Sequence, residues 1–297
     1  MCEKIIKFKM SHNREFIVAP QWYGAITRGT EIGAQRIVEL FKIEGETELI
    51  KKLHISENNA YEDYKLMPHF NVIDEANRSI CEYVNAALSA GSKVITIGGD
   101  HSVSWGSISG ALKFNPEIGV VYIDAHGDCN IAESSLTHHI HGMHMAYLMG
   151  FGDSKYVGRY TKNLLPVQNI LYVGARSLDP YEVELMKTQD VPLISSSFIN
   201  SNHTSTLENI RKFVSNFKQI HVSLDIDVLD PSVAPGTGVP EVDGISEESL
   251  NMMLDEIINT NTVGSIDLVE FNPLCDVDCR TEKVVGRLVK KLSNIYY

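Results

Sequence analysis

The feature that most constrains the fold is the alternation, along the whole chain, of short β-rich runs with segments of helical periodicity. We expect seven strands: FIVAP (16–20), KVITIGG (93–99), GVVYID (119–124), NILYVGA (169–175), VPLI (191–194), IHVSLDID (220–227) and VGSIDLVE (263–270). Apolar residues recur at helical spacing in EIGAQRIVELFK (31–42), NVIDEANRSICEYVNAALSA (71–90), ISEESLNMMLDEII (245–258) and RTEKVVGRLVKKL (280–292). Strands that alternate with helices form right-handed βαβ units, so the pattern predicts a three-layer α/β/α fold with a central, mainly parallel sheet.

The domain organisation follows from what separates these segments. The 297 residues contain no Pro- or Ser-rich linker, no internal repeat and no low-complexity stretch, so we expect a single domain over residues 1–297. The longest irregular stretches are CNIAESSLTHHI (129–140) and DPSVAPGTGVPEVDG (230–244). Long loops inside a compact domain are usually functional, and those that follow parallel strands line the ligand crevice.

Charge and composition exclude several classes of partner. The formal net charge of −12 argues against nucleic acid or an anionic membrane surface. No apolar run approaches the ~20 residues that span a bilayer, and the first 16 residues lack the apolar core of a signal peptide. The five cysteines are odd in number and scattered, so we expect a reduced, cytoplasmic protein.

Three of the expected strands end in residues that are able to bind metal ions. KVITIGGDHS ends in Asp100 and His101, and the other two runs, GVVYIDAHGD and HVSLDIDVLD, end in further acids and an imidazole. Residues two apart in an extended chain point to one side, and parallel strands bring their carboxyl ends to one edge of the sheet. We therefore expect one cluster formed by His101, Asp124, His126, Asp128, Asp225 and Asp227.

The charge of this cluster predicts its cofactor. Four buried carboxylates cannot lie together unless cations neutralise them, and two divalent ions balance four negative charges. Mostly oxygen ligands without a thiolate favour Mn²⁺ over Zn²⁺. We interpret Asp230, before Pro231, as a turn former, and place Asp100 beside the ligands rather than among them.

Two other segments do not match the known calcium-binding and phosphate-binding motifs. DIDVLDPSVAPG lacks the glycine and glutamate that a calcium loop requires at its sixth and twelfth positions. GGDHSVSWGSISG has no Lys-Ser/Thr pair after its glycines, so it is not a phosphate-binding P-loop.

The same residues carry a resemblance to a known family. GGDHSVSWG, DAHGDCN and SLDIDVLDPSVAPGTG resemble, in order and spacing, the three signatures of the ureohydrolases, the family of arginases and agmatinases. The resemblance runs from IVAPQWYGAITRGTEIGAQRI to VEFNP. It implies a single α/β domain that forms homotrimers or homohexamers and hydrolyses a guanidino group to urea by attack of a hydroxide that bridges two Mn²⁺ ions.

Residue by residue, the resemblance also implies roles. His101, Asp124, Asp128 and Asp225 match the ligands of one ion, and Asp124, His126, Asp225 and Asp227 match those of the other. HIHGM resembles the catalytic-loop motif, which makes His141 the proton-shuttling histidine, and Glu270 in DLVEFNP resembles the glutamate that holds the substrate guanidinium. The resemblance also implies that Asp128 is a catalytic residue as well as a metal ligand.

The substrate expectation is narrower. Arginine needs polar partners for its α-carboxylate and α-ammonium groups, whereas its decarboxylated analogue agmatine does not. Asn130, Thr137, His139, Asp179 and Glu182 match substrate-binding positions of arginases, so the chain most resembles these. Two residues depart from the family pattern: His139 stands where arginases usually have Asn, and Val239 replaces a common Thr, for which we predict reduced turnover.

Alternatives from other classes stay open at this point. Agmatine, or another guanidino compound, is the second substrate candidate. A catalytically silent ureohydrolase-like binding protein is the different-class alternative, against which stand the complete set of ligands, His141 and Glu270. A binuclear phosphoesterase is a third interpretation, but the chain shows no basic residues arranged for phosphate.

Overall fold

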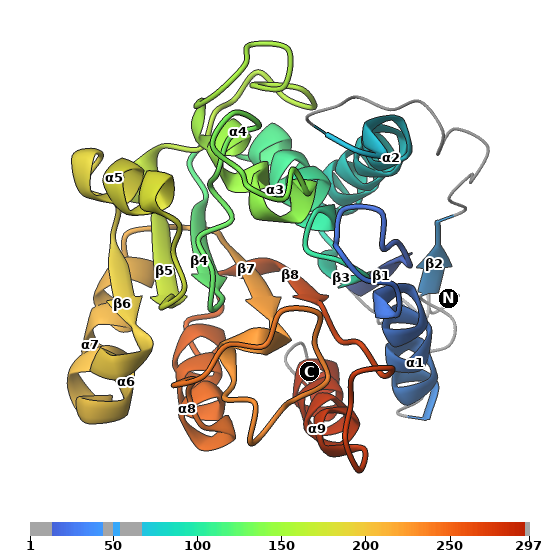
Figure 1. Cartoon of the computed structure of the whole chain (residues 1–297), viewed down its shortest axis with the longest axis vertical. Coiled ribbons are helices and arrows are strands. Elements are labelled where there is room, and N and C mark those ends of the chain that lie inside the picture. The colour runs from blue at the N-terminus through green and yellow to red at the C-terminus, as the bar shows by residue number, and fades with distance from the viewer. Residues whose placement is uncertain (1–13, 44–49, 54–66, 295–297) are drawn as a thin grey trace, which may run out of the picture.

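The structure is a computed structural model that describes residues 14–43, 50–53 and 67–294. The expectation about a signal peptide concerns the first 16 residues, most of which lie outside the described residues. Within the described residues, eight strands form one sheet in the order β2-β1-β3-β8-β7-β4-β5-β6, and every neighbouring pair is parallel (Figure 1). The strands are β1 (Arg14–Ala19), β2 (Ile50–Lys52), β3 (Lys93–Gly98), β4 (Gly119–Ile123), β5 (Ile170–Gly174), β6 (Leu193–Ser195), β7 (Ile220–Asp225) and β8 (Val263–Val269).

Helices cover both faces of the sheet. The first face packs against α1 (Thr30–Ile43), α6 (Ser196–Ser201), α7 (His203–Val214), α8 (Glu247–Ile258) and α9 (Arg280–Asn294). The second packs against α2 (Phe70–Ser89), α3 (Val103–Phe114), α4 (His144–Met149) and α5 (Pro180–Thr188). The predicted three-layer α/β/α architecture with a parallel sheet is confirmed, and Figure 1 shows the two helical layers on either side of the sheet.

The seven expected strands are all present, and the short edge strand β2 is an addition to them. Buried strand residues alternate between the two layers: Val121 and Ile123 of β4 pack with the first face, whereas Val120 and Tyr122 pack with the second. The central strands are therefore apolar on both sides, as expected of a parallel sheet that is covered on both faces.

Helix α3 was not among the segments with helical periodicity, and its packing explains why. Its sequence, VSWGSISGALKF, is rich in glycine and serine, which are weak helix formers. A Cβ atom at Gly106 would lie 2.5 Å from the Asn77 carbonyl oxygen, and one at Gly110 would lie 2.6 Å from that of Cys81. The glycines thus allow α3 to pack closely against α2, and tertiary packing stabilises a helix that propensity does not favour.

Across the described residues, none of the helices has the length and apolar character that a bilayer crossing requires.

Candidate metal centre and its pocket

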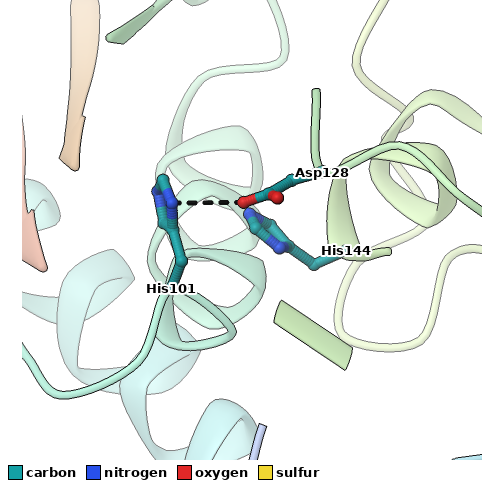
Figure 2. Close-up of side chains that lie close together, drawn as sticks. All are labelled: His101, Asp128 and His144. Carbon is teal, nitrogen blue, oxygen red and sulfur yellow. Dashed lines mark ion pairs between the residues drawn. The ribbon is translucent and has the colours of Figure 1, made fainter. Parts of the chain in front are cut away.

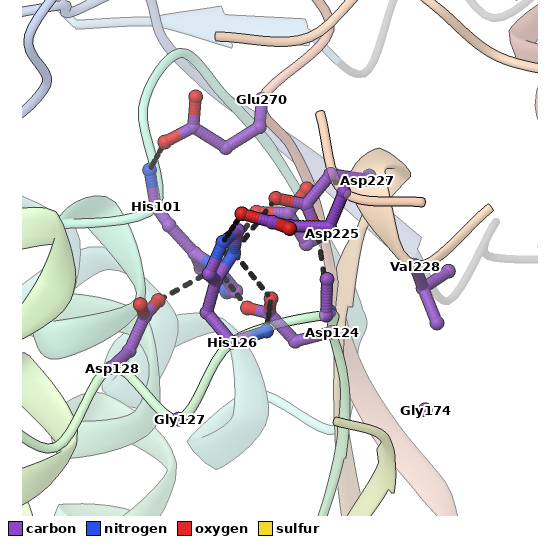
Figure 3. Close-up of polar contacts among 12 residues, drawn as sticks. His101, Asp124, His126, Gly127, Asp128, Gly174, Asp225, Asp227, Val228 and Glu270 are labelled. Carbon is purple, nitrogen blue, oxygen red and sulfur yellow. Dashed lines mark hydrogen bonds and ion pairs between the residues drawn. The ribbon is translucent and has the colours of Figure 1, made fainter. Parts of the chain in front are cut away.

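The candidate site lies at the carboxyl ends of the four central strands, β3, β8, β7 and β4 (Figure 3). Asp124 follows β4 directly, Asp225 is the last residue of β7, and Glu270 follows β8. His101 lies on the turn between β3 and α3. The structure therefore brings the predicted strand ends to one edge of the sheet, as the parallel arrangement requires.

Three carboxylates surround one imidazole at this edge. The Nδ1 atom of His101 lies 2.9 Å from Asp124 Oδ2, 3.1 Å from Asp225 Oδ2 and 3.2 Å from Asp128 Oδ2. Burial alone would lower the pKa of His101, but the three carboxylates raise it well above its usual value. The arrangement therefore favours positive charge, whether a proton or a metal ion provides it.

A second group shares Asp124 with the first. His126 Nδ1 lies 3.0 Å from Asp227 Oδ2 and 3.5 Å from Asp124 Oδ1. Asp124, His126 and Asp227 each offer a ligand atom within 4.8 Å of the others, as do His101, Asp124 and Asp225. Five of the six residues predicted as ligands thus form two overlapping groups joined by Asp124. The sixth, Asp128, joins the first group through its contact with His101.

The residues present fit a pair of divalent cations. Asp124 Oδ2 is buried and has no hydrogen-bond partner among the described residues, although it faces His101. Burial, and then the charges of Asp227 and Asp124, raise the pKa of Asp225 well above its usual value. Ligands at right angles on an octahedral ion, each ~2.1 Å from it, lie about 3 Å apart, as the ligand atoms around His101 do. Cations would relieve both the orphaned oxygen and the carboxylate repulsion.

Two residues of the centre adopt backbone conformations that side chains rarely take. Asp128 has φ 48° and Glu270 has φ 62°. The chain turns at Asp128, and this turn directs the Asp128 carboxylate towards His101. Such strain persists where the surrounding structure fixes it, and it concentrates at functional sites.

Glu270 and His141 contact one another beside this centre. Glu270 Oε1 accepts a hydrogen bond from the backbone N–H of His101 (2.8 Å) and lies 3.2 Å from His141 Nδ1. The backbone N–H of His141 in turn donates to the carbonyl of Gly24. Asp100 supports this loop, because its carboxylate accepts the Gly24 and Ser102 N–H groups and does not enter the ligand cluster.

A pocket of about 220 Å³ opens over the ligands. Its lining includes His141, Glu270 and four of the five residues predicted to bind substrate, namely Asn130, Thr137, Asp179 and Glu182. His139, the fifth, does not line it; its ring lies edge-on to His141, with the ring centroids 6.2 Å apart. The polar lining also contains Glu241, which the sequence did not single out and whose Oε1 lies 3.7 Å from His126 Nε2.

Hydrogen bonds between the loop after β4 and the start of α5 hold the outer wall of the pocket together. Asn130 Nδ2 donates to Asp179 Oδ2 at 2.8 Å, which joins the loop after β4 to the start of α5. Glu182 accepts the N–H groups of Cys129 and Asp179, each at 2.9 Å. Burial raises the pKa of Glu182 to about 7. These residues shape the wall as well as face the pocket.

Arg176 fixes the long loop on the other side. Its guanidinium donates five hydrogen bonds, all to backbone carbonyls, those of Gly174, Asp227, Val228, Glu241 and Val242. Asp230 begins this loop as the predicted turn former, accepting the N–H groups of Ser232 and Gly244. The segment 230–244 is therefore anchored at both ends to the strand edge.

Beneath His101 lies a buried polar network that we did not predict. His101 Nε2 donates to Ser223 Oγ (2.8 Å), Ser223 lies 3.0 Å from Ser104 Oγ, and Ser104 donates to Asp267 Oδ2 (2.8 Å). Because Ser104 gives its proton to Asp267, Ser223 must give its own to Ser104. The chain of donors fixes a proton on Nε2 of His101 and leaves Nδ1 to face the carboxylates.

The network ends in a buried His–Asp contact. His221 Nε2 lies 3.1 Å from Asp267 Oδ2, and Ser265 lies 2.8 Å from His221 Nδ1. The strand register places these residues together, because His221 pairs with Ser265 and Ser223 pairs with Asp267. The signal in the sequence was the alternation of polar residues in HVSLD and GSIDL, which puts each set on one face of its strand.

Comparison with known proteins agrees with this geometry. The sequence model of the arginase family matches residues 16–293. An arginase of Brevibacillus brevis is 29% identical, with 95% of this chain and 98% of that protein covered. An arginase of Bacillus subtilis (strain 168) is 30% identical, with 92% and 95% covered.

Solved structures give the same relationship. The crystal structure of Entamoeba histolytica arginase in complex with L-ornithine superposes with a TM-score of 0.87 at 26% identity, over 95% of this chain and 98% of that chain. The agmatine ureohydrolase of Thermoplasma volcanium shares the fold, with a TM-score of 0.70 at 20% identity over 94% and 87% of the two chains. The chain therefore belongs to the arginase family, whose members are hydrolases that act on the guanidino group of arginine.

Proposed function

We propose that the protein is a manganese-dependent arginase, which hydrolyses L-arginine to L-ornithine and urea with two Mn²⁺ ions per subunit. The observation that carries the proposal is the pair of ligand groups joined by Asp124, lying below a pocket lined by Glu270 and His141. His101, Asp124, Asp128 and Asp225 would hold one ion, and Asp124, His126, Asp225 and Asp227 the other. When bound, the two ions would lower the pKa of a water molecule and provide hydroxide at neutral pH.

Glu270 would bind and orient the guanidinium group. Its Oε1 is held by the His101 N–H and by His141, whereas Oε2 receives no hydrogen bond among the described residues. A guanidinium is a planar fork of donors that stays protonated, and a fixed carboxylate oxygen at the pocket wall suits it. The positive φ of Glu270 places this carboxylate directly after β8, at the edge where the ligands lie.

His141 would supply the proton that the departing amine requires. Burial would lower the pKa of His141, but its contact with Glu270, together with the charges of Asp128 and Asp100, raises it above the usual value. The raised pKa favours the protonated form of the imidazole. Because His141 also lines the pocket, it lies where a proton can be exchanged with solvent and passed to a leaving group.

The outer pocket supports arginine as the substrate. Asp179 and Glu182 would face its α-ammonium group, and Asn130 and Thr137 would face its α-carboxylate. One observation favours agmatine as a second candidate: the lining contains a further carboxylate, Glu241, and no Lys or Arg among the residues described. A terminal ammonium group without a carboxylate would suit such a wall.

The test is urea release from L-arginine, agmatine and other guanidino compounds by protein loaded with Mn²⁺. We expect the highest kcat/KM with L-arginine, loss of activity on chelation, and recovery when Mn²⁺ returns. Faster turnover of agmatine would contradict the substrate assignment alone. Absence of urea from every compound, with two ions bound according to elemental analysis, would support the silent binding protein instead.

Two further parts of the proposal come from the family resemblance. We infer a homotrimer or homohexamer acting in the cytoplasm on a small cationic substrate. Light scattering after size-exclusion chromatography would determine the mass of the assembly, and a monomer would contradict the inference.

A further inference from the structure

The hydroxyl group of Tyr122, on β4, lies among three side chains of the metal centre. Its oxygen is 2.7 Å from Asp128 Oδ2, 3.2 Å from His101 Nδ1 and 3.2 Å from His144 Nε2. The Tyr122 and His101 rings stack with an interplanar angle of 4°. All four residues are buried. Figure 2 shows three of them, His101, Asp128 and His144, with the Asp128 carboxylate between the two imidazoles.

Distance alone would make these three side chains a separate metal site. His101, Asp128 and His144 each offer a ligand atom within 4.8 Å of the others. The Tyr122 oxygen, however, lies within 3.2 Å of all three atoms and so occupies the space between them. A hydroxyl group, rather than a third cation, therefore fills this position.

The protons around Tyr122 can be counted. His144 Nδ1 lies 2.9 Å from the carbonyl oxygen of His141, and because a carbonyl only accepts, Nδ1 carries the hydrogen. With the hydrogen on Nδ1, the other ring nitrogen, Nε2, faces the Tyr122 hydroxyl at 3.2 Å as an acceptor. Tyr122 thus has one hydrogen and two acceptors, Asp128 Oδ2 and His144 Nε2, and His101 Nδ1 is a third only when it carries no proton.

The number of acceptors changes when a cation binds. An ion held by His101 and Asp128 would take the Nδ1 lone pair of His101, whereas the Asp128 carboxylate has about four lone-pair sites and can still accept a hydrogen bond. The acceptors left to the Tyr122 hydrogen are then Asp128 and His144 Nε2. Without His144, Asp128 would be the one acceptor left to the buried hydroxyl, and a buried hydroxyl without a partner costs about 1–3 kcal/mol.

We propose that Tyr122 and His144 are a positioning pair for the ion held by His101 and Asp128: Tyr122 donates to the Asp128 carboxylate and orients it, and His144 Nε2 offers the Tyr122 hydrogen a second acceptor while the ion enters. The proposal rests on the two-ion centre proposed above and adds two residues to it. The pair also connects the metal ligands to the loop of His141, through the bond from His144 to the His141 carbonyl.

The backbone supports the same connection. The N–H of Met145, next to His144, donates to the carbonyl of Asp128 at 3.0 Å, and the N–H of Asn130 donates to the carbonyl of Gly142 at 3.1 Å. The loop after β4 and the start of α4 are therefore cross-linked on both sides of the Tyr122 hydroxyl. His144 occupies the first position of α4, where a side chain can reach both segments.

The first test is Tyr122→Phe, which removes only the hydroxyl. We expect Mn²⁺ titration, followed by the electron paramagnetic resonance of free Mn²⁺, to show one of the two binding steps weakened by about tenfold or more, the usual effect of losing a residue that orients a metal ligand. The other step should be unchanged. Tyr147→Phe is the matched control, because Tyr147 is equally buried and its hydroxyl bonds to the backbone of Ala132, away from the ligands.

The second test separates the acceptor from the bulk of His144. His144→Gln keeps an acceptor near the position of Nε2, whereas His144→Leu removes it at similar volume. We expect Leu to weaken the same binding step as Tyr122→Phe, and Gln to keep it within about threefold of the parent, with thermal melting to check that each variant folds. If His144→Leu does not fold, Tyr122→Phe decides.

The outcomes distinguish the two proposals. Parent protein that binds no Mn²⁺ would overturn the proposed function. Parent protein that binds two ions, with Tyr122→Phe unchanged or with both steps weakened equally, would overturn the positioning pair alone. Equal weakening by Leu and Gln would overturn the acceptor role of His144.

Discussion

Replacement of Asp267 by Asn tests whether the network beneath His101 serves the metal centre. Asp267 is fully buried, and its Oδ2 accepts hydrogen bonds from Ser104, Ser107 and His221. Asn has nearly the same shape but no charge, so the substitution leaves the packing and removes the negative charge. The relay that fixes the Nε2 proton of His101 would lose its anionic end.

The expected cost follows from these contacts. A hydrogen bond to a charged group is stronger than a neutral one by about 1 kcal/mol, so three such bonds predict a loss of about 3 kcal/mol in the free energy of unfolding. The amide would also place its NH₂ group where Oδ1 lies. Because Oδ1 has no partner among the described residues, that NH₂ group would be buried without an acceptor. Poorer orientation of His101 predicts Mn²⁺ affinity lower by about 10-fold to 100-fold.

The pH dependence has a definite sign. Burial would raise the pKa of Asp267, but His221 and the serines lower it below its usual value. A depressed pKa stabilises the folded state above the unfolded pKa of ~4, and this contribution is lost as the pH falls through the folded value. The deficit of Asp267→Asn relative to the parent should therefore shrink below about pH 4.

The assay is urea unfolding of the metal-free proteins together with Mn²⁺ titration. Asp255→Asn is the control, because Asp255 forms an exposed ion pair with Lys291 on α9 and lies outside the network; we expect it to change stability by less than about 0.5 kcal/mol. A folded Asp267→Asn protein that binds both ions with the parent's affinity would refute the role of the relay. If Asp267→Asn lowers the free energy of unfolding but not the Mn²⁺ affinity, the network beneath His101 stabilises the fold and does not serve the metal centre.

Three other predictions concern the pocket. His141→Asn should lower kcat by about 100-fold or more while leaving two Mn²⁺ ions per subunit, because a general acid contributes on that scale; retained turnover would exclude His141 as the proton donor. Mn²⁺ at about 1,000 times its dissociation constant should stabilise the protein by about 4 kcal/mol, visible as a higher melting temperature than in EDTA, and equal melting temperatures would argue against the centre. Val239→Thr should raise kcat/KM by adding a hydroxyl group to the pocket that Glu270 also lines, whereas an unchanged value would show that Val239 does not limit turnover.

The parallel sheet and the ligand cluster were predictable because each depends on a local pattern. Continuous apolar runs identify central strands, and a parallel sheet leaves their carboxyl ends on one edge whatever the order of the strands. Asp124, His126 and Asp225 therefore had to lie near each other once the strands were assigned.

What the sequence did not reveal depends on contacts between distant segments. Helix α3 forms because its glycines fit against α2, which no propensity scale contains. Strand β2 has three residues, too few for an alternating pattern. Tyr122 and His144 are 22 residues apart, and only the fold places the hydroxyl of one beside the imidazole of the other. His139 was assigned from its position in the arginase pattern, and that position does not determine whether its side chain lines the pocket.

The hydrogen bonds of Arg176 affect which residues of the pocket can be substituted without changing its backbone. All five of its hydrogen bonds are accepted by backbone carbonyls, so they do not depend on which side chains those residues carry. Glu241 and its neighbours can thus be exchanged while the main chain beneath them keeps its course. This rim is a natural place to engineer selectivity among guanidino compounds, because new side chains there would be displayed on an unaltered scaffold.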